Sequence, residues 1–183
     1  MPRRKVQEEL SKERILETAR ELFVTEGYEQ LSMRKLAKKL GYSHGSIYYH
    51  FQNKAELFFA LVKEDFASLT KEVEPFVSRG SLQDVFIAYM RFGLTYRSHY
   101  EVMFLLQNDD VQNYMVDETN ESYRVLAKAV QFHTTKTLSI QEIWSLYLSL
   151  HGFVTHYLKR GQSYEELEEI VKAHATFLSE AVS

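Results

Sequence analysis

Residues 31–54 read LSMRKLAKKLGYSHGSIYYHFQNK, and this stretch decides the fold of the chain. Ser32 can cap one short helix, and Gly41 suits the left-handed turn that would end it. Ser43 can cap a second short helix over roughly 44–50. Two short helices joined by a tight turn form a helix-turn-helix, which places its second helix in the major groove of DNA. The stretch therefore predicts double-stranded DNA as a ligand.

The rest of the chain has the pattern of helices joined by short turns. Ser11 is positioned to cap a helix that runs to about Glu26, and Asn53 to cap another that runs to about Lys71. Three serines have an acidic residue three positions later, which is the spacing of a capping box. These pairs are Ser81 with Asp84, Ser139 with Glu142, and Ser163 with Glu166. Ser139 opens a long helix over roughly 140–159, which Gly161 ends. Ser163 opens another over roughly 164–182. Because no segment has strand periodicity, the sequence predicts an all-α fold with about nine helices.

Charge and breaks in the pattern divide the chain in two. Residues 1–54 carry 11 basic and 7 acidic side chains, a net charge of +4, whereas residues 55–183 carry 11 basic and 18 acidic ones, a net charge of −7. The clearest internal break is PFVSRGS, residues 75–81, with further interruptions expected near Ser98–His99 and Asn108–Asp109. Since the helix that starts after Asn53 is expected to bridge both parts, we predict domains at 1–54 and 55–183.

Composition argues against several other classes of protein. The chain has no Cys, which fits a reducing cytosol, and no apolar run near the roughly 18 residues that a bilayer span requires. The N-terminus, MPRRKVQEEL, lacks the apolar stretch of a signal peptide, so we expect a cytoplasmic protein without membrane contact. No Ser/His/Asp signature, phosphate loop or HExxH motif occurs, so we predict no enzyme activity and no cofactor. His99 and His133 are isolated, and His151 and His156 splay around one helix, so we predict no metal site.

Residues 11–54 resemble the TetR family of bacterial repressors. The densest part of the match is Gly41, then Ser43–His44–Gly45–Ser46, then Tyr48–Tyr49–His50–Phe51, then Lys54. The resemblance implies a transcriptional regulator that binds DNA, with His44 and Arg34 at base edges and His50 and Lys54 at phosphates. The full set of predicted DNA-binding residues is Arg34, Ser43, His44, Gly45, Ser46, Tyr48, Tyr49, His50 and Lys54.

The residues of the second short helix support the same interpretation. Ile47 and Phe51 are four residues apart and should pack this helix against its neighbours. His44, Gly45, Ser46 and Tyr49 then fall on the free side. Because Gly45 has no side chain, it would allow the start of the helix to approach DNA closely. Basic residues on an exposed helix are often only solvated, and this alternative stays open for Lys38 and Lys39.

The family resemblance implies that the C-terminal part binds a small molecule. An aromatic stripe over 86–104, together with Tyr147 and His151, supplies side chains that could line such a site. The predicted effector-binding residues are Tyr89, Phe92, Tyr96, Tyr100, Phe104, Tyr147 and His151. Each of them could instead belong to the core, and Gly93 could leave room either for a ligand or for close helix packing. His151–Gly152, after an aromatic at 147, resembles the Trp-His-Gly signature of one subgroup, with Tyr in place of Trp.

The last two helices are predicted to make a homodimer. The helix over 140–159 is apolar nearly all round, so it must be covered on more than one side. Two such helices from each chain would form a four-helix bundle across a two-fold axis. The predicted interface residues are Ile143, Leu150, Val154, Tyr157, Leu167, Val171, His174 and Leu178. The sequence thus predicts a dimeric repressor that a small-molecule effector releases from a palindromic operator. An effector-independent DNA-binding protein and a metal-responsive sensor are the alternatives.

Overall fold

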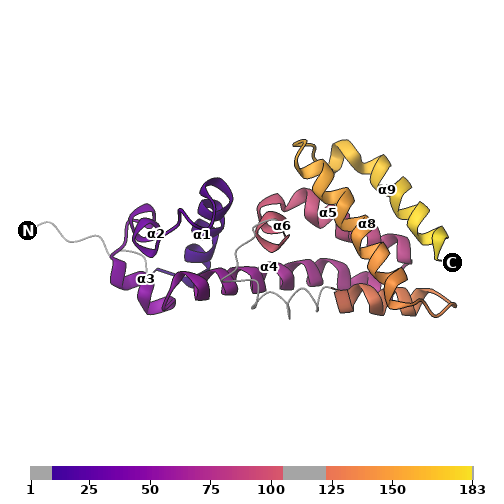
Figure 1. Cartoon of the computed structure of the whole chain (residues 1–183), viewed down its shortest axis with the longest axis horizontal. Coiled ribbons are helices and arrows are strands. Elements are labelled where there is room, and N and C mark those ends of the chain that lie inside the picture. Colours follow the sequence, from indigo (N-terminus) through magenta and orange to yellow (C-terminus); the bar gives the residue numbers. More distant parts are fainter. Residues whose placement is uncertain (1–9, 105–122, 183) are drawn as a thin grey trace, which may run out of the picture.

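The computed structural model describes residues 10–104 and 123–182, and every element in these ranges is a helix (Figure 1). The predicted all-α fold is therefore confirmed. A helical segment over 123–133 lies between α6 and α8. The other helices are α1 (Lys12–Glu26), α2 (Met33–Leu40), α3 (His44–His50), α4 (Lys54–Val77), α5 (Leu82–Thr95), α6 (Arg97–Phe104), α8 (Ile140–Leu158) and α9 (Tyr164–Ala181).

The predicted helix starts are confirmed by their caps. The side chains of Ser11, Ser32, Ser43 and Asn53 each accept a hydrogen bond from the backbone N–H three residues later. All three predicted capping boxes are present, at the starts of α5, α8 and α9. Gly41 ends α2 with φ 77° and ψ 23°, the left-handed conformation that glycine adopts at low cost. Local sequence therefore sets most of the helix boundaries.

Helix α4 is longer than the sequence predicted. It continues past Lys71 and through Pro75 to Val77, although proline removes one helical hydrogen bond. Contacts from other parts of the chain hold this last turn. Val73 is buried, and Nε2 of His133 lies 3.1 Å from the carbonyl oxygen of Phe76, which has no helical partner so close to the helix end.

Two predicted interruptions have different outcomes. The break between α5 and α6 falls at Tyr96, two residues before the predicted Ser98–His99, and the backbone N–H of Tyr96 still donates to the carbonyl of Phe92. The two helices are thus separated by a single residue. The interruption predicted near Asn108–Asp109 lies outside the described residues.

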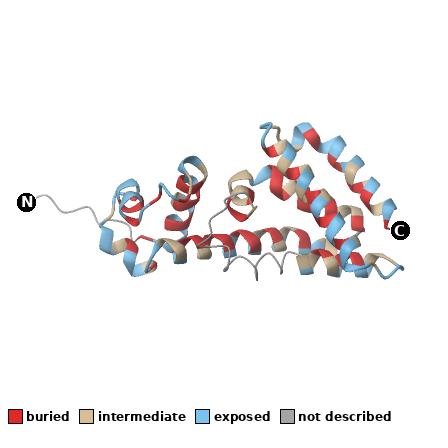
Figure 2. Ribbon diagram, in the orientation of Figure 1, coloured by how far each residue is buried: buried red, intermediate tan, exposed pale blue. Residues whose placement is uncertain are grey.

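The molecule is elongated, with two helix clusters joined by α4 (Figure 1). Helices α1, α2 and α3 gather at the N-terminal end of α4, whereas α5, α8 and α9 gather toward its other end, and α6 lies between the clusters and contacts both α1 and α4. The buried residues face inward in both clusters (Figure 2). Ile47 and Phe51 are buried at 0% and 2% exposure, so their predicted packing role is confirmed.

Helix α5 is the centre of the C-terminal cluster, where it packs against α4, α8 and α9. Gly93 lies where α5 approaches its neighbours closely. A Cβ atom at this position would overlap Cγ1 of Val154 and lie 2.9 Å from Cδ2 of Tyr100. The structure therefore resolves the two roles considered for Gly93 in favour of close helix packing.

Candidate DNA-binding surface and effector region

The surface of α3 presents aromatic and polar side chains to solvent. Tyr49 is 86% exposed and Tyr48 is 43% exposed. His44 is exposed and lies edge-on to Tyr48, with ring centroids 4.6 Å apart. His50 is half-buried and packs edge-on against Tyr49 at 5.3 Å. A tyrosine as exposed as Tyr49 contributes little to the core, so its ring and hydroxyl are available for contact with another molecule.

The start of α3 is open enough for a close approach. Gly45 is exposed, and a Cβ atom there would meet only Oγ of Ser43, at 3.9 Å. The fold itself therefore does not require glycine at this position. Ser43 and Ser46 serve the local structure, because Oγ of Ser43 accepts from the N–H of Ser46 and lies 2.7 Å from its hydroxyl.

The basic residues of α2 separate into two pairs. Lys35 forms an ion pair with Glu26, and Nζ of Lys39 lies 2.8 Å from Oε1 of Glu21. These two lysines therefore join α2 to α1. Arg34 and Lys38 are exposed and form no ion pair within the described residues. Arg34 and Lys38 consequently leave their positive charges available to phosphates or bases.

Lys54 lies at the first turn of α4 and is engaged within the protein. Its Nζ donates to the backbone oxygen of Tyr28 at 3.0 Å and lies 4.0 Å from the centre of the Tyr28 ring. This contact fastens the start of α4 to the turn between α1 and α2. A contact of Lys54 with phosphate, as the sequence predicted, would have to share its ammonium with Tyr28.

Five of the predicted effector-binding residues meet in the C-terminal core. The hydroxyl groups of Tyr89 and Tyr100 are 3.1 Å apart, and that of Tyr100 lies 2.7 Å from Nδ1 of His151. The ring of Tyr147 lies 6.3 Å from that of Tyr89 and 6.2 Å from that of His151. Phe104 packs against Tyr100 at 4.6 Å. Helices α5, α6 and α8 thus share one hydrogen-bonded chain inside an aromatic cluster.

Burial keeps this chain uncharged near neutral pH. It raises the pKa values of Tyr89 and Tyr100, and it raises the pKa of Tyr147 to about 12. It also lowers the pKa of His151. The chain therefore consists of neutral groups that both donate and accept hydrogen bonds, which suits it to recognise a polar group of a ligand.

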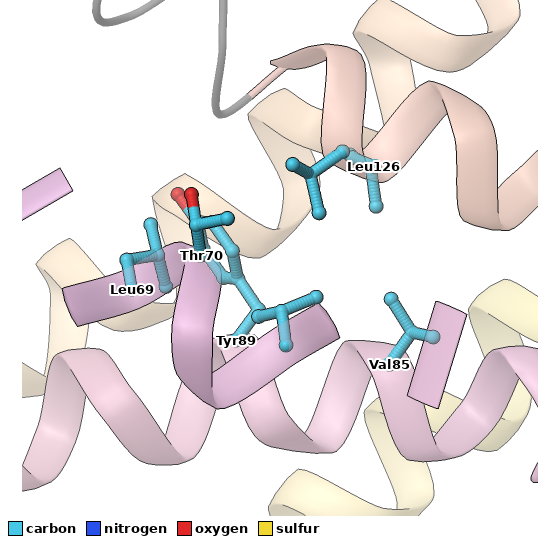
Figure 3. Close-up of a pocket in the computed structure, with 7 residues that line it drawn as sticks. Leu69, Thr70, Val85, Tyr89 and Leu126 are labelled. Atoms are coloured by element: carbon cyan, nitrogen blue, oxygen red, sulfur yellow. The ribbon is translucent and has the colours of Figure 1, made fainter. Parts of the chain in front are cut away.

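An apolar crevice adjoins Tyr89 between α4, α5 and the helical segment over 123–133 (Figure 3). The crevice has a volume of about 10 Å³, which is room for about one water molecule. A larger ligand would need its walls to move apart. They are formed by Leu69, Thr70, Val73, Val85, Tyr89, Val125 and Leu126.

The other two predicted effector-binding residues lie elsewhere. Phe92 is 2% exposed and Tyr96 is 43% exposed, and both line a separate groove between α4 and the junction of α5 with α6. Their ring centroids are 5.2 Å apart. The structure therefore divides the predicted effector set between the core and this groove.

Comparison with known proteins identifies the family. Residues 15–61 match the sequence profile described as "Bacterial regulatory proteins, tetR family". The HTH-type transcriptional repressor AcnR of Corynebacterium efficiens is 32% identical over 171 residues, which is 88% of each chain. The chain belongs to the TetR family. It is a transcriptional regulator that binds DNA, and it is not an enzyme.

Solved structures of TetR-like regulators share the whole fold. The transcriptional regulator FadR from Bacillus subtilis, determined in complex with stearoyl-CoA, aligns with a TM-score of 0.79 at 16% identity, over 94% of this chain and 100% of that one. The fatty acid degradation regulator FadR from Bacillus halodurans aligns with a TM-score of 0.77 at 16% identity, over 96% of each chain. At this level of identity the likeness establishes the fold of our TetR-family protein and not its ligand.

The predicted dimer residues of this TetR-family chain are mostly buried within a single copy. Tyr157 and His174 are half-buried. The other six, each at most 6% exposed, are Ile143, Leu150, Val154, Leu167, Val171 and Leu178. Helices α8 and α9 both pack on α5, and that contact accounts for this burial. The large apolar residues that remain exposed on these helices are Ile140, Trp144, Leu148, Ile170 and Phe177.

A buried charged cluster joins the two parts of the TetR-family chain and was not anticipated from the sequence. Nη2 of Arg20 in α1 lies 2.6 Å from Oδ1 of Asp65 in α4, and Nδ1 of His99 in α6 lies 2.9 Å from the same oxygen. Asp65 is 0% exposed and Arg20 is 8% exposed. The sequence did contain one indication of this cluster. Arg20 and Asp65 are charged residues that fall on the apolar faces of their helices.

In residues 10–104 and 123–182, no group of three or more His, Cys, Asp and Glu side chains is arranged to hold a metal ion. Within the same ranges, no helix combines the length and apolar character needed to cross a membrane.

Proposed function

We propose that this protein is a homodimeric repressor that binds a palindromic operator and leaves it when a small molecule binds the C-terminal cluster. The observation that carries the proposal is the exposed face of α3, on which Tyr49 is 86% exposed. Its neighbours on this face are His44 and Gly45, and Arg34 adds an unpaired charge from α2. Together they offer stacking, hydrogen-bonding and electrostatic contacts to a major groove.

Dimerisation through α8 and α9 follows from the apolar residues left exposed there. Ile170, His174 and Phe177 are spaced as one stripe along α9. His174 connects this stripe to α8, because its Nε2 lies 3.2 Å from Oγ of Ser149 and its ring stacks on Phe153 at 4.9 Å. The same two helices of a second copy would bury this stripe, and the four helices together would form a four-helix bundle.

The effector would bind by opening the crevice beside Tyr89. The crevice supplies apolar walls, and the chain from Tyr89 to His151 supplies neutral polar groups. An effector can displace the protein from DNA only if it binds the released conformation more tightly than the DNA-bound one. Separation of α4 from α5 would satisfy this condition, because it would open the crevice to the effector. It would also move α1, α2 and α3, which lie at the N-terminal end of α4, away from their DNA-bound positions.

The test is selection of bound sequences from a randomised duplex library at moderate salt. A dimer should select an inverted repeat whose half-sites are about 34–36 Å apart, or somewhat more. Weak, salt-sensitive binding without sequence preference would contradict the proposal. A compound screen on the selected operator then separates the alternatives. A compound counts as the effector only if it changes both operator affinity and thermal stability. If no compound does so, the alternative holds that this is an effector-independent DNA-binding protein.

A further inference from the structure

A surface groove at the junction of α5 with α6 has the features of a small binding site. It has a volume of about 220 Å³ and is lined by Ser68, Lys71, Glu72, Phe92, Tyr96 and His99. The rings of Tyr96 and His99 have centroids 5.6 Å apart, and those of Phe92 and His99 are 6.4 Å apart. These three rings form one wall of the groove, and Tyr96 is 43% exposed within it.

The polar groups of the groove favour a negatively charged occupant. The carboxylate of Glu72 has a positive partner in Arg91, whose Nη2 lies 3.7 Å from Oε2 of Glu72. The hydroxyl of Ser68 already donates to a backbone oxygen at 3.0 Å. Within the described part of the chain, neither the ammonium of Lys71 nor the hydroxyl of Tyr96 has a hydrogen-bond or ion-pair partner. One unpaired positive charge beside aromatic rings therefore remains.

We propose that this groove binds a small organic anion that carries a single aromatic ring and a carboxylate. The ring would pack against Phe92 and Tyr96, and the carboxylate would accept hydrogen bonds from Lys71 and from the Tyr96 hydroxyl. The volume sets the size, because the groove is smaller than the roughly 300–1,000 Å³ of sites for drug-sized ligands. The site is distinct from the core crevice beside Tyr89.

The occupant would touch the charged cluster that joins the two parts of the protein. His99 lines the groove and also bonds Asp65, which holds Arg20 of α1. A ligand that repositions the His99 ring therefore acts on the carboxylate that fixes α1. This consequence rests on the proposed function, whereas binding in the groove does not.

The experiment is a calorimetric titration of the full chain with sodium benzoate in the absence of DNA. The variants are Lys71→Met and Tyr96→Ala, and the control is Lys63→Met, an exposed lysine of α4 that does not line the groove. Unchanged circular dichroism would establish that each variant is folded. We expect saturable binding to the wild type and the control, and at least tenfold weaker binding to both groove variants.

Three results would overturn the proposal. The first is that the wild type shows no saturable binding of benzoate. The second is that Lys71→Met binds benzoate as tightly as the wild type does. The third is that the wild type binds the uncharged analogue benzyl alcohol as tightly as it binds benzoate.

A second measurement compares operator affinity with and without saturating benzoate. We expect a change of at least threefold, and no change would overturn the coupling through His99. Failure of the wild type to bind any operator would instead count against the proposed function.

Discussion

The carboxylate of Asp65 in α4 holds the guanidinium of Arg20 in α1 through two hydrogen bonds, of 2.6 Å and 3.3 Å. Neither side chain is open to solvent, with exposures of 0% and 8%. A buried carboxylate without its partner is far more costly than the same pair intact. The pair therefore fixes where α1, and with it the DNA-binding helices, sits on α4.

Replacement of one member of this pair should be strongly destabilising. We expect Asp65→Ala to lower the free energy of unfolding by about 3–5 kcal/mol, because it leaves the Arg20 charge buried without a partner. The double variant Arg20→Met, Asp65→Leu should regain most of this loss. Urea unfolding followed by circular dichroism measures both. A loss below about 1 kcal/mol in Asp65→Ala would mean that the pair behaves like an exposed one.

Tyr49→Ala should weaken specific DNA binding without unfolding the protein. The side chain is 86% exposed, so its removal deletes little from the core. We expect at least a tenfold loss of operator affinity, which is about 1.4 kcal/mol, with an unchanged melting temperature. Fluorescence anisotropy with a labelled operator provides the measurement. Phe132→Ala, which removes an aromatic ring that is 62% exposed in the helical segment over 123–133, is the matched control. Equal affinity of Tyr49→Ala and the wild type would mean that α3 is not the recognition helix.

Gly45→Ala separates a role in DNA contact from a role in folding. Because a Cβ atom at this position meets only Ser43 Oγ at 3.9 Å, stability should be unchanged or rise by up to about 1 kcal/mol. Operator affinity should nevertheless fall, since the methyl group would hold α3 away from the groove. Gly93→Ala is the opposite case and should lose about 1–3 kcal/mol of stability through overpacking against Val154. Operator binding by Gly45→Ala as tight as that of the wild type would disprove the close approach.

Stability should decrease as the pH falls below the ordinary pKa of histidine. Burial lowers the pKa values of His151 and His174 from 6.5. The unfolded chain therefore takes up these protons more readily, so the free energy of unfolding is highest above about pH 6.5 and declines below it. Urea unfolding at about pH 7.5 and about pH 5.5 should show a smaller difference for the variant His151→Gln, His174→Gln than for the wild type.

Glu142 provides an internal check on this pH range. Its pKa is about 2, because the backbone N–H of Ser139 and the side chain of Lys136 bond its carboxylate. The stability that it contributes is complete above its ordinary pKa of 4.5 and is lost as the pH falls toward 2. A Glu142→Gln variant should therefore leave the difference between about pH 7.5 and about pH 5.5 unchanged. Equal pH dependence in the histidine variant and the wild type would exclude the two histidines as its cause.

Phe177→Glu should convert a dimer into a folded monomer. Phe177 is 66% exposed in a single chain, so a charge there is harmless to the monomer but would be buried against the partner. Sedimentation velocity measures the change in mass. Tyr49→Glu, which places the same charge on the exposed face of α3, is the control and should remain dimeric. An unchanged dimer in Phe177→Glu would move the interface away from this stripe.

Sequence reasoning succeeded where a feature depends on neighbouring residues. The caps at Ser11, Ser32 and Ser43 each involve a hydrogen bond three residues along the chain, so spacing alone predicts them. The buried face of α3 was likewise evident from Ile47 and Phe51, because an interval of four residues places both on one side.

Features that depend on distant residues were missed or misplaced. The end of α4 beyond Pro75 relies on His133, which the sequence gives no reason to place nearby. The apolar pattern of α8 predicted that the helix is buried on several sides. It did not predict that α5 of the same chain buries much of it. Exposed residues such as Leu148 and Phe177 could therefore be separated from the core only in three dimensions.

The length of α4 has a mechanical consequence. Its 24 residues correspond to about 36 Å at 1.5 Å per residue. A tilt of roughly 5° at the end near α5 would carry α3 sideways by about 3 Å, which is close to the 3.4 Å rise of one base pair. In a dimer the two arms would swing in opposite directions, so the two shifts of about 3 Å would add to about 6 Å between the recognition helices. That misfit is nearly two base-pair steps on the operator, although the displacement within the core is small.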